Sequence, residues 1–390
     1  MIARKRLDIG WRDLALGLGA CLRAGKPGDN DFCDSKSLVC LSVRSGFDLL
    51  LSALALPAGS EVLISVTIPA MPRILAEHGL IPVPVDLDMS TLSVTAGALR
   101  NAVTPQTKAI VVAHLFGSRM DMEPVLAVAR EHHLFVIEDC AQAFAGPTFK
   151  GHPESDVRMF SFGPIKTATA VGGAVFFIRD AALRAEMEKR QATYPRQSRF
   201  GYFQRLLLFS FFKLLLAPGP YGGIIGLLRR SGQNHDEVVT GLGQSFTGPN
   251  FFAKIRHQPC AALRWLIGHR LRTYPVSQVE DRAVAGREVL SALPAGTVLG
   301  EMATAHSFWV FPIVTDAREE LMQRLRDAGF DAASGATSLC AIEPPADRPA
   351  MRAQAAEAAL ARALYLPVYA ALPAPERQRL AGVVLAWLKR

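Results

Sequence analysis

The hydrophobic pattern between residues 62 and 178 alternates short, β-branched runs with amphipathic stretches. This alternation is typical of βαβ units arranged around a mainly parallel sheet. Several runs are almost wholly apolar, as expected of strands that are covered on both faces. The pattern predicts strands at residues 62–65, 81–85, 109–113, 134–137, 159–162 and 174–178, with helices between them. Asp121 is expected to cap one of these helices, which runs to His132.

A second region begins after residue 259 and has a different pattern. The sequence predicts helices at 278–290, 318–327 and 374–389 and a strand at 308–314. A chain of 390 residues exceeds the usual length of one domain, which is roughly 100 to 200 residues. We therefore predict a large domain over residues 1–259 and a smaller α+β domain over residues 260–390.

An apolar segment at about 200–250 interrupts this organisation. Residues 206–216 and 221–228 form two apolar runs around a Pro-Gly-Pro break, with arginines on both sides. A transmembrane helix needs about 20 apolar residues, and neither run reaches that length. The basic flanks suit a hairpin that contacts an anionic membrane through about 200–230, and a buried or dimer-interface hairpin fits equally well. Both interpretations stay open.

The formal net charge of +8 is compatible with nucleic acid, an anionic membrane surface or an anionic substrate. The sequence contains no nucleic-acid-binding motif and no dense run of Lys or Arg, so we expect no nucleic-acid partner. Six scattered cysteines without CxxC pairs predict neither a metal site nor a disulfide framework. The N-terminus lacks the apolar stretch of a signal peptide. We expect a cytoplasmic protein, with association at the inner face of the membrane as the alternative.

Two side chains with chemical potential follow predicted strands. Asp139 comes directly after the run at 134–137, and this position places it at the carboxyl edge of a parallel sheet, where such proteins bind ligands. Its carboxylate could pair with a protonated ring nitrogen of a cofactor, or it could cap the next helix. Lys166 follows the run at 159–162, and a lysine in such a loop can condense with an aldehyde, although a lone loop lysine is usually solvated.

The blocks that contain these residues resemble a known family. The chain reads EDCAQA at residues 138–143, FSFGPIK at 160–166 and GG at 172–173, and further matches are PVPVDLD at 82–88, HLFG at 114–117 and LYLP at 364–367. Together they resemble the DegT/DnrJ/EryC1/StrS family of sugar aminotransferases. The resemblance covers most of the chain except about 200–251.

The resemblance implies an α/β fold of the pyridoxal-phosphate (PLP)-dependent fold type I, which is aspartate-aminotransferase-like. It implies that Lys166 is the Schiff-base lysine, that Asp139 pairs with the pyridinium nitrogen, that Gln142 lies against the cofactor ring and that Ser161 binds its phosphate. Ser45 and Gly46 match the family's phosphate-binding turn, at the start of a helix predicted over 47–56. The family also implies a homodimer that moves an amino group from a donor such as glutamate to a carbonyl acceptor, for example a nucleotide-linked keto-sugar.

The chain departs from the family in several places. Phe47 replaces a threonine of the phosphate turn, Ile68 replaces an aromatic residue that stacks on the cofactor, and no histidine-tyrosine acceptor pair is present in 331–345. The family's glycine-x-asparagine-x-arginine block is not intact, since Gly248, Asn250 and Arg256 are differently spaced. Two alternatives therefore accompany the main interpretation: an aminotransferase for an amphiphilic or lipid-linked acceptor, and a catalytically quiet, membrane-associated member of the family.

Overall fold

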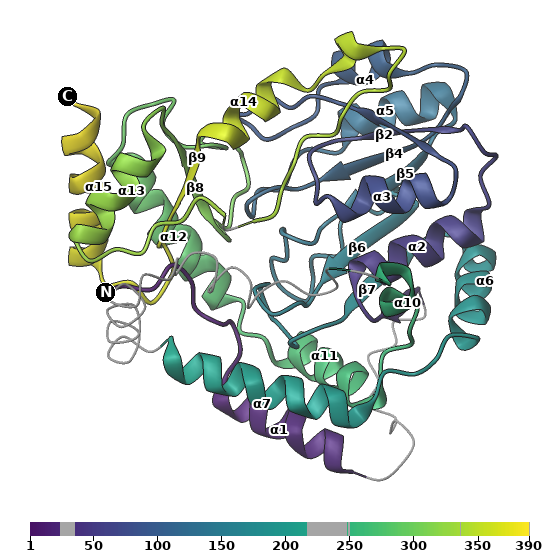
Figure 1. Cartoon of the computed structure of the whole chain (residues 1–390), viewed down its shortest axis with the longest axis horizontal. Coiled ribbons are helices and arrows are strands. Elements are labelled where there is room, and N and C mark those ends of the chain that lie inside the picture. Colours follow the sequence, from purple (N-terminus) through teal and green to yellow (C-terminus); the bar gives the residue numbers. More distant parts are fainter. Residues whose placement is uncertain (24–35, 217–247, 249, 336, 390) are drawn as a thin grey trace.

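The computed structural model describes residues 1–23, 36–216, 248, 250–335 and 337–389. Its main element is a seven-stranded sheet of order β1-β7-β6-β5-β4-β2-β3, in which β7 runs antiparallel to both neighbours and the other strands are parallel to one another (Figure 1). The predicted α/β fold with a mainly parallel sheet is confirmed. The strands are β1 Ser37–Cys40, β2 Glu61–Ile64, β3 Ile81–Pro84, β4 Thr107–Ala113, β5 Phe135–Asp139, β6 Val157–Ser161 and β7 Ala174–Ile178.

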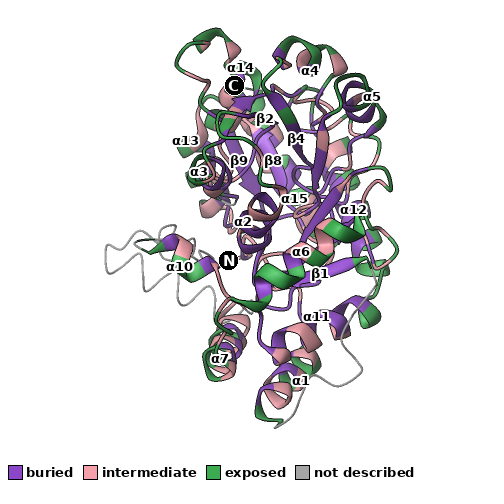
Figure 2. Ribbon diagram, turned by 90° about the vertical axis from the view of Figure 1, so that its right-hand side faces the viewer, coloured by how far each residue is buried: buried purple, intermediate pink, exposed green. Residues whose placement is uncertain are grey.

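The sheet is the middle layer of the large body, and helices cover both of its faces. The helices of this region are α1 Trp11–Leu22, α2 Val43–Leu54, α3 Ala70–Glu77, α4 Ala96–Ala102, α5 Glu123–His132, α6 Ala181–Ala192, α7 Arg199–Leu215, α10 Phe251–Ile255 and α11 Ala261–Thr273. Neighbouring residues of a strand point to opposite faces of the sheet. In β5, Val136 packs with α4 and α5 on one face, and Ile137 packs with α2 and α3 on the other. Helices α1, α7 and α11 pack over Phe160, Val175 and Phe177 at the β6–β7 end. Figure 2 shows the strands as buried.

The C-terminal region forms a smaller body around the antiparallel pair β8 Phe311–Val314 and β9 Ala363–Leu366. Its helices are α12 Ser277–Ser291, α13 Arg318–Asp327, the short 3-10 helix η1 Pro349–Met351, α14 Gln354–Arg362 and α15 Ala374–Leu388. The chain begins in this body, where Ile2 forms an isolated β-bridge with Phe330, and then crosses to α1 (Figure 1). The domain boundary at residues 259 and 260 stays a prediction, and α11, just beyond it, packs on α1.

Three predicted boundaries are wrong. Helix α2 begins at Val43 and not at residue 47, because the Ser42 hydroxyl accepts the Ser45 N–H at 3.1 Å and so caps an earlier turn. Helix α5 begins at Glu123 and its N-cap position is Met122. Asp121 accepts the Glu123 N–H at 3.0 Å, but it lies one residue before the N-cap position. The strand predicted at 308–314 starts only at Phe311.

The structure describes part of the apolar segment at about 200–250. The run at 206–216 lies almost wholly in α7, whereas the run at 221–228 lies outside the described residues. Among the helices that the structure describes, none is both long enough and apolar enough to cross a membrane.

Candidate active site

Lys166 sits in a tightly bonded loop between β6 and β7. The Thr169 hydroxyl donates to the Gly163 carbonyl at 2.6 Å, and the Ala168 N–H donates to the Asp8 carboxylate at 3.0 Å. The Trp309 indole N–H donates to the carbonyl of Ile165 at 3.0 Å, and the Lys166 Nζ lies 4.1 Å from the centre of that indole ring. The loop is therefore held by its own hydrogen bonds and by contacts from two distant parts of the chain, Asp8 and Trp309, which is unlike the setting of a solvated loop lysine.

The environment of Lys166 favours its neutral amine. The pKa of the Lys166 amine is lowered to about 8, mainly by burial; the Asp139 charge opposes this shift and the Arg44 charge adds to it. A neutral lysine amine is the form that attacks an aldehyde, so this environment activates Lys166 as a nucleophile and proton carrier.

Asp139 ends β5 beside the strand that leads to Lys166. Its Oδ1 accepts the Ala141 N–H at 2.9 Å, and within the described residues its Oδ2 accepts no hydrogen bond. Burial raises the pKa of Asp139, while the Ala141 N–H and the charges of Lys166 and His114 act against this shift. Asp139 as a residue is 8% exposed, and a carboxylate oxygen that has no donor among the described residues fits a protonated pyridine nitrogen, so the residues present fit PLP at this position.

The N-terminus of α2 faces the same region. Ser45 lies in its first turn, where its hydroxyl is 2.9 Å from that of Ser42. Gly46 is required by packing, because a Cβ there would lie 2.1 Å from the Phe176 ring. Arg44 lies beside Ser45, and within the described residues its guanidinium has neither a hydrogen bond nor an ion pair. Burial lowers the pKa of Arg44, and its charge acts on Lys166.

The remaining predicted cofactor ligands lie at the same sheet edge. The Gln142 side-chain oxygen accepts the Phe116 N–H at 2.9 Å, which fixes its side chain after β5. Ser161 ends β6, and among the described residues its hydroxyl has one long contact, at 3.5 Å from the Gly163 N–H. The structure thus brings Ser161 and Gln142 to the edge that carries Asp139, and their assignment as cofactor ligands stays a prediction.

Three side chains near the site were missed by sequence reasoning. Trp309 and Lys5 come from segments far from Lys166, and the Lys5 Nζ lies 4.7 Å from the centre of the Trp309 ring. Burial lowers the pKa of Lys5 to about 7, helped by the Lys166 and Arg4 charges. No local sequence motif indicates Lys5 or Trp309. Arg44 directly precedes Ser45, so it could have been identified from the sequence.

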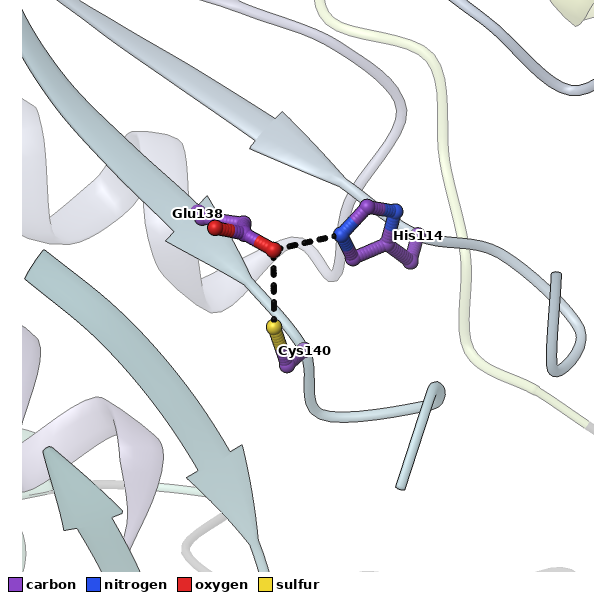
Figure 3. Close-up of side chains that lie close together, drawn as sticks. All are labelled: His114, Glu138 and Cys140. Atoms are coloured by element: carbon purple, nitrogen blue, oxygen red, sulfur yellow. Dashed lines mark hydrogen bonds and ion pairs between the residues drawn. The ribbon is translucent and has the colours of Figure 1, made fainter. Parts of the chain in front are cut away.

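Glu138, next to Asp139, points to the opposite face and belongs to a buried cluster with His114 and Cys140 (Figure 3). The His114 Nε2 lies 2.9 Å from the Glu138 carboxylate, and its Nδ1 accepts the Met120 N–H. Because Nδ1 is the acceptor, Nε2 carries the proton and donates it to Glu138. Neither ring nitrogen retains a lone pair for a metal, so we interpret the cluster as structural.

The departures from the family pattern have local explanations. Arg256 forms two hydrogen bonds of 2.9 Å with the buried Asp48 of the same chain, and it is thus committed to a structural ion pair. Asn250 precedes α10 with a left-handed backbone. The segment at 331–345 reaches the end of β2, where Cys340 and Thr67 exchange two backbone hydrogen bonds.

A cavity of about 660 Å³ lies at Lys166 and Trp309 and extends along the N-terminal segment. Its lining includes Tyr365 and Tyr369 of the smaller body and Arg12 and Lys213 of α1 and α7. The cavity has room for a substrate larger than an amino acid.

The structure resembles solved aminotransferases over nearly its whole length. Sugar aminotransferase CalS13 from Micromonospora echinospora aligns with a TM-score of 0.68 at 18% identity, covering 99% of this chain and 100% of that one. The Helicobacter pylori aminotransferase PseC aligns with a TM-score of 0.69 at 15% identity, covering 100% and 99%. The predicted PLP-dependent fold type I is confirmed, and this is the class of protein that the fold and the site define.

Sequence comparison agrees with the fold. The model of the DegT/DnrJ/EryC1/StrS aminotransferase family matches residues 31–209, which confirms the resemblance that the motifs predicted over this part of the chain. GDP-perosamine synthase of Caulobacter vibrioides is 34% identical over 200 residues, which cover 48% of this chain and 54% of that protein. A UDP-N-acetyl-3-dehydro-alpha-D-glucosamine 3-aminotransferase of Acidithiobacillus ferrooxidans is 37% identical over 153 residues, covering 38% and 41%. These matches span about half the length of the curated relatives or less.

Proposed function

We propose that this chain is a PLP-dependent aminotransferase that moves an amino group from an amino-acid donor, glutamate, to the carbonyl of a keto-sugar. The observation that carries the proposal is the pair of Lys166 and Asp139, which lie close enough for their charges to interact at the carboxyl edge of the sheet. The family match over residues 31–209 supports the same reaction class.

PLP, when bound, supplies an aldehyde carbon and a ring that accepts the electrons of a breaking C–H bond. Lys166 would hold the cofactor through its amine, and the same amine, once free and neutral, would carry the proton that the donor Cα gives up. Asp139 would keep the ring nitrogen protonated through the oxygen that accepts no hydrogen bond from the described residues. Trp309 holds the loop that carries Lys166 by its hydrogen bond to the Ile165 carbonyl.

The cofactor phosphate is assigned to the start of α2. Its first-turn N–H groups, Ser45 and Ser161 offer hydrogen bonds, and Arg44 adds a positive charge that the family's threonine would not supply. Phe47 fills the place of that threonine and is fully buried, so it takes no part in binding.

The acceptor class follows from the relatives and the cavity. The names of the two relatives above refer to a GDP-linked and a UDP-linked sugar. A third relative, 35% identical over 165 residues, is named as an aminotransferase for L-glutamine and 2-deoxy-scyllo-inosose. The basic cavity suits an anionic acceptor of this kind. We further propose a homodimer that works in the cytoplasm, since family members share their active sites between two subunits.

A second candidate is an aminotransferase for an amphiphilic or lipid-linked acceptor at the inner face of the membrane. The observation that favours it is the set of exposed apolar side chains on α7, within the segment at about 200–230. The catalytically quiet alternative is weakened by the lowered pKa of Lys166, since a scaffold has no use for an activated amine.

The test is the donor half-reaction. Protein loaded with PLP is mixed with glutamate in the absence of any acceptor, and 2-oxoglutarate is measured. We expect about one equivalent per active site from the wild type and from Lys189→Ala, an exposed lysine on α6, but none from Lys166→Ala. Equal product from Lys166→Ala, or none from the wild type with any of several amino acids, would remove the proposal.

A further inference from the structure

Residues 1–9 form a strap that crosses from the smaller body to α1 (Figure 1). At its start, Ile2 makes two backbone hydrogen bonds to residues 329 and 331 of the smaller body, at 2.8 and 3.0 Å. The Arg4 guanidinium then makes two hydrogen bonds of 2.7 Å to the Asp331 carboxylate. At its end, Ile9 is buried in the hydrophobic cluster of α1, α7 and α11. Between these anchors the strap lines the cavity described above.

The loop after Lys166 has a backbone that needs support from other parts of the chain. Ala168 and Val171 are not glycines, but their φ angles are 55° and 60°, in the left-handed region. This conformation is unfavourable for an L-residue, and it persists only where surrounding contacts hold it. The Arg205 side chain donates to the Val171 carbonyl at 2.7 Å and supports one of the two residues. The other, Ala168, lies two positions after Lys166.

Asp8 of the strap supports Ala168. Its Oδ2 accepts the Ala168 N–H at 3.0 Å and the Tyr274 hydroxyl at 2.7 Å. Burial and the Asp8 charge raise the pKa of Tyr274, so its hydroxyl stays protonated and remains a donor. The Arg270 guanidinium donates to the Asp8 carbonyl at 2.8 Å and lies 3.8 Å from the Asp8 carboxylate. One carboxylate oxygen thus joins the Lys166 loop to the end of α11.

The two contacts from distant parts of the chain lie on either side of Lys166. Trp309 donates to the carbonyl of Ile165, the residue before the lysine, and Asp8 accepts the N–H of Ala168, two residues after it. A loop held at both points keeps the amine in one place. Position matters here, because a displacement of about 1 Å at a reacting group can cost about 100-fold in rate.

The same loop position keeps the Lys166 amine buried. Burial is the main cause of its lowered pKa, and the charges that act on it are those of Asp139 and Arg44. Its own charge acts on Lys5 of the strap. Loss of the contact between Asp8 and Ala168 would let water reach the amine, which raises its pKa. Loss of the Asp8 negative charge alone acts in the opposite direction, since it disfavours a nearby cation.

We propose that Asp8 is a positioning residue of the aminotransferase reaction, because by accepting the Ala168 N–H it holds the Lys166 loop in the reacting position. This inference rests on the proposed function and adds to it a residue outside the matched family region of 31–209. The strap is thereby part of the active site, and not only a link between the two bodies.

The proposal is tested by the pH dependence of PLP capture, followed by stopped-flow absorbance of the full-length chain after removal of any bound cofactor. In the wild type we expect a midpoint at about pH 8. In Asp8→Ala the midpoint should rise by about one pH unit or more, toward the ordinary lysine value of 10.5, and capture at pH 8 should slow about tenfold or more. An unchanged or lower midpoint would overturn the proposal.

Two variants that preserve shape carry the same test. The amide oxygen of Asp8→Asn can accept both hydrogen bonds, so its midpoint should stay at the wild-type value or fall slightly with the lost charge. Tyr274→Phe removes one of the two donors that hold the Asp8 carboxylate, and its midpoint should rise by less than in Asp8→Ala. A rise in Asp8→Asn equal to that in Asp8→Ala would overturn the proposal. So would an unchanged midpoint in Tyr274→Phe, even where Asp8→Ala does not fold.

Asp13→Ala is the matched control. Asp13 lines the same cavity and pairs with Arg270 and His269, and among the described residues no hydrogen bond or ion pair joins it to the Lys166 loop. This variant should unfold at a lower urea concentration, with its capture midpoint unchanged. Equal rises in Asp13→Ala and Asp8→Ala would assign the effect to the lost partner of Arg270 and overturn the role of Asp8.

The same measurements separate this inference from the function on which it rests. A wild type that captures no PLP at any pH would remove the proposed function, and this inference with it. Wild-type capture on Lys166 that Asp8→Ala leaves unchanged would keep the function and overturn the positioning role of Asp8.

Discussion

The carboxyl edge of the sheet and the corner between α1 and α7 both bring cations near apolar side chains, but the surroundings of these cations differ. At the edge, Lys166 and Asp139 are held by hydrogen bonds and by Trp309, and their pKa values are shifted by burial. At the corner, Lys213 lies on the inner face of α7, where charges of both signs act on it, and the outer face of the same helix is apolar and exposed. The edge thus has the features of a reaction site, whereas the described residues leave the outer face of α7 uncovered.

The difference separates what the chain shares with its family from what it does not. The family match ends at residue 209, inside α7, and the edge residues lie within it. Even at the edge, the chain departs from the family pattern, since the buried Phe47 stands where the family has a threonine, and the proposed phosphate contact of Arg44 would replace that hydroxyl. The reaction class is thus expected to survive changes at the corner, whereas the acceptor is expected not to.

Asp139→Asn gives the largest expected effect. An amide cannot keep the cofactor nitrogen protonated, so turnover should fall on the order of 1000-fold, within the usual range for loss of a positioned acid-base partner. Single-turnover kinetics with glutamate measure this effect. The control is Asp180→Asn, the same change at the exposed start of α6, where asparagine caps a helix equally well. A fall of less than tenfold would remove Asp139 from the chemistry.

Neighbouring leucines of α7 test the contrast between its two faces. Leu206 is fully buried and Leu207 is 46% exposed. Leu206→Ala should lower the free energy of unfolding by about 2–5 kcal/mol, and Leu207→Ala by less than about 0.5 kcal/mol. Urea denaturation of both variants provides the measurement. Similar losses at the two positions would mean that the outer face is covered within the subunit.

Arg44→Gln tests the proposed contact between Arg44 and the cofactor phosphate. Removing a charge that contacts the cofactor phosphate should weaken PLP binding by about 10-fold to 100-fold, in line with a hydrogen bond to a charged group. Pyridoxal, which has no phosphate, is the matched ligand, and its affinity should not change. Fluorescence titration of the apo-protein with both ligands distinguishes the outcomes. Parallel weakening of both would show that Arg44 acts on the fold or on Lys166 alone.

The pH dependence of cofactor capture gives the smallest expected effect. Only the neutral Lys166 amine attacks the aldehyde, so the rate should rise with pH and level off above about 8, where burial has placed its pKa. In Asp139→Asn the midpoint should fall, because the carboxylate that favours the charged amine is gone. Stopped-flow absorbance over a pH series measures both. A rate that keeps rising beyond pH 10 would mean an unperturbed lysine.

The sequence predicted those parts of the fold that depend on local pattern. Strands covered on both faces appear as continuous apolar runs, so β2 to β7 were found, with ends differing by a few residues. Asp139 and Lys166 were found because strand ends place them at one edge. Strand β1 was missed, since four residues of SLVC carry too little pattern.

Other features depend on tertiary contacts that no local pattern shows. Helix α1 contains Gly17 and Gly19, and glycine costs about 1 kcal/mol in a helix. Gly17 is explained only by packing, because a Cβ there would lie 3.0 Å from Leu266 of α11. Lys5 and Trp309 reach the site from segments more than 100 residues away from Lys166.

The central claim is that Lys166 captures the cofactor, and covalent trapping tests it most directly. Wild-type protein is mixed with PLP at pH 8, reduced with borohydride and digested, and the modified peptide is identified by mass spectrometry. The account predicts one pyridoxyl group per chain, on Lys166, which is lost in Lys166→Ala without reappearing on the nearby Lys5. Modification of several surface lysines with Lys166 unlabelled would contradict the account.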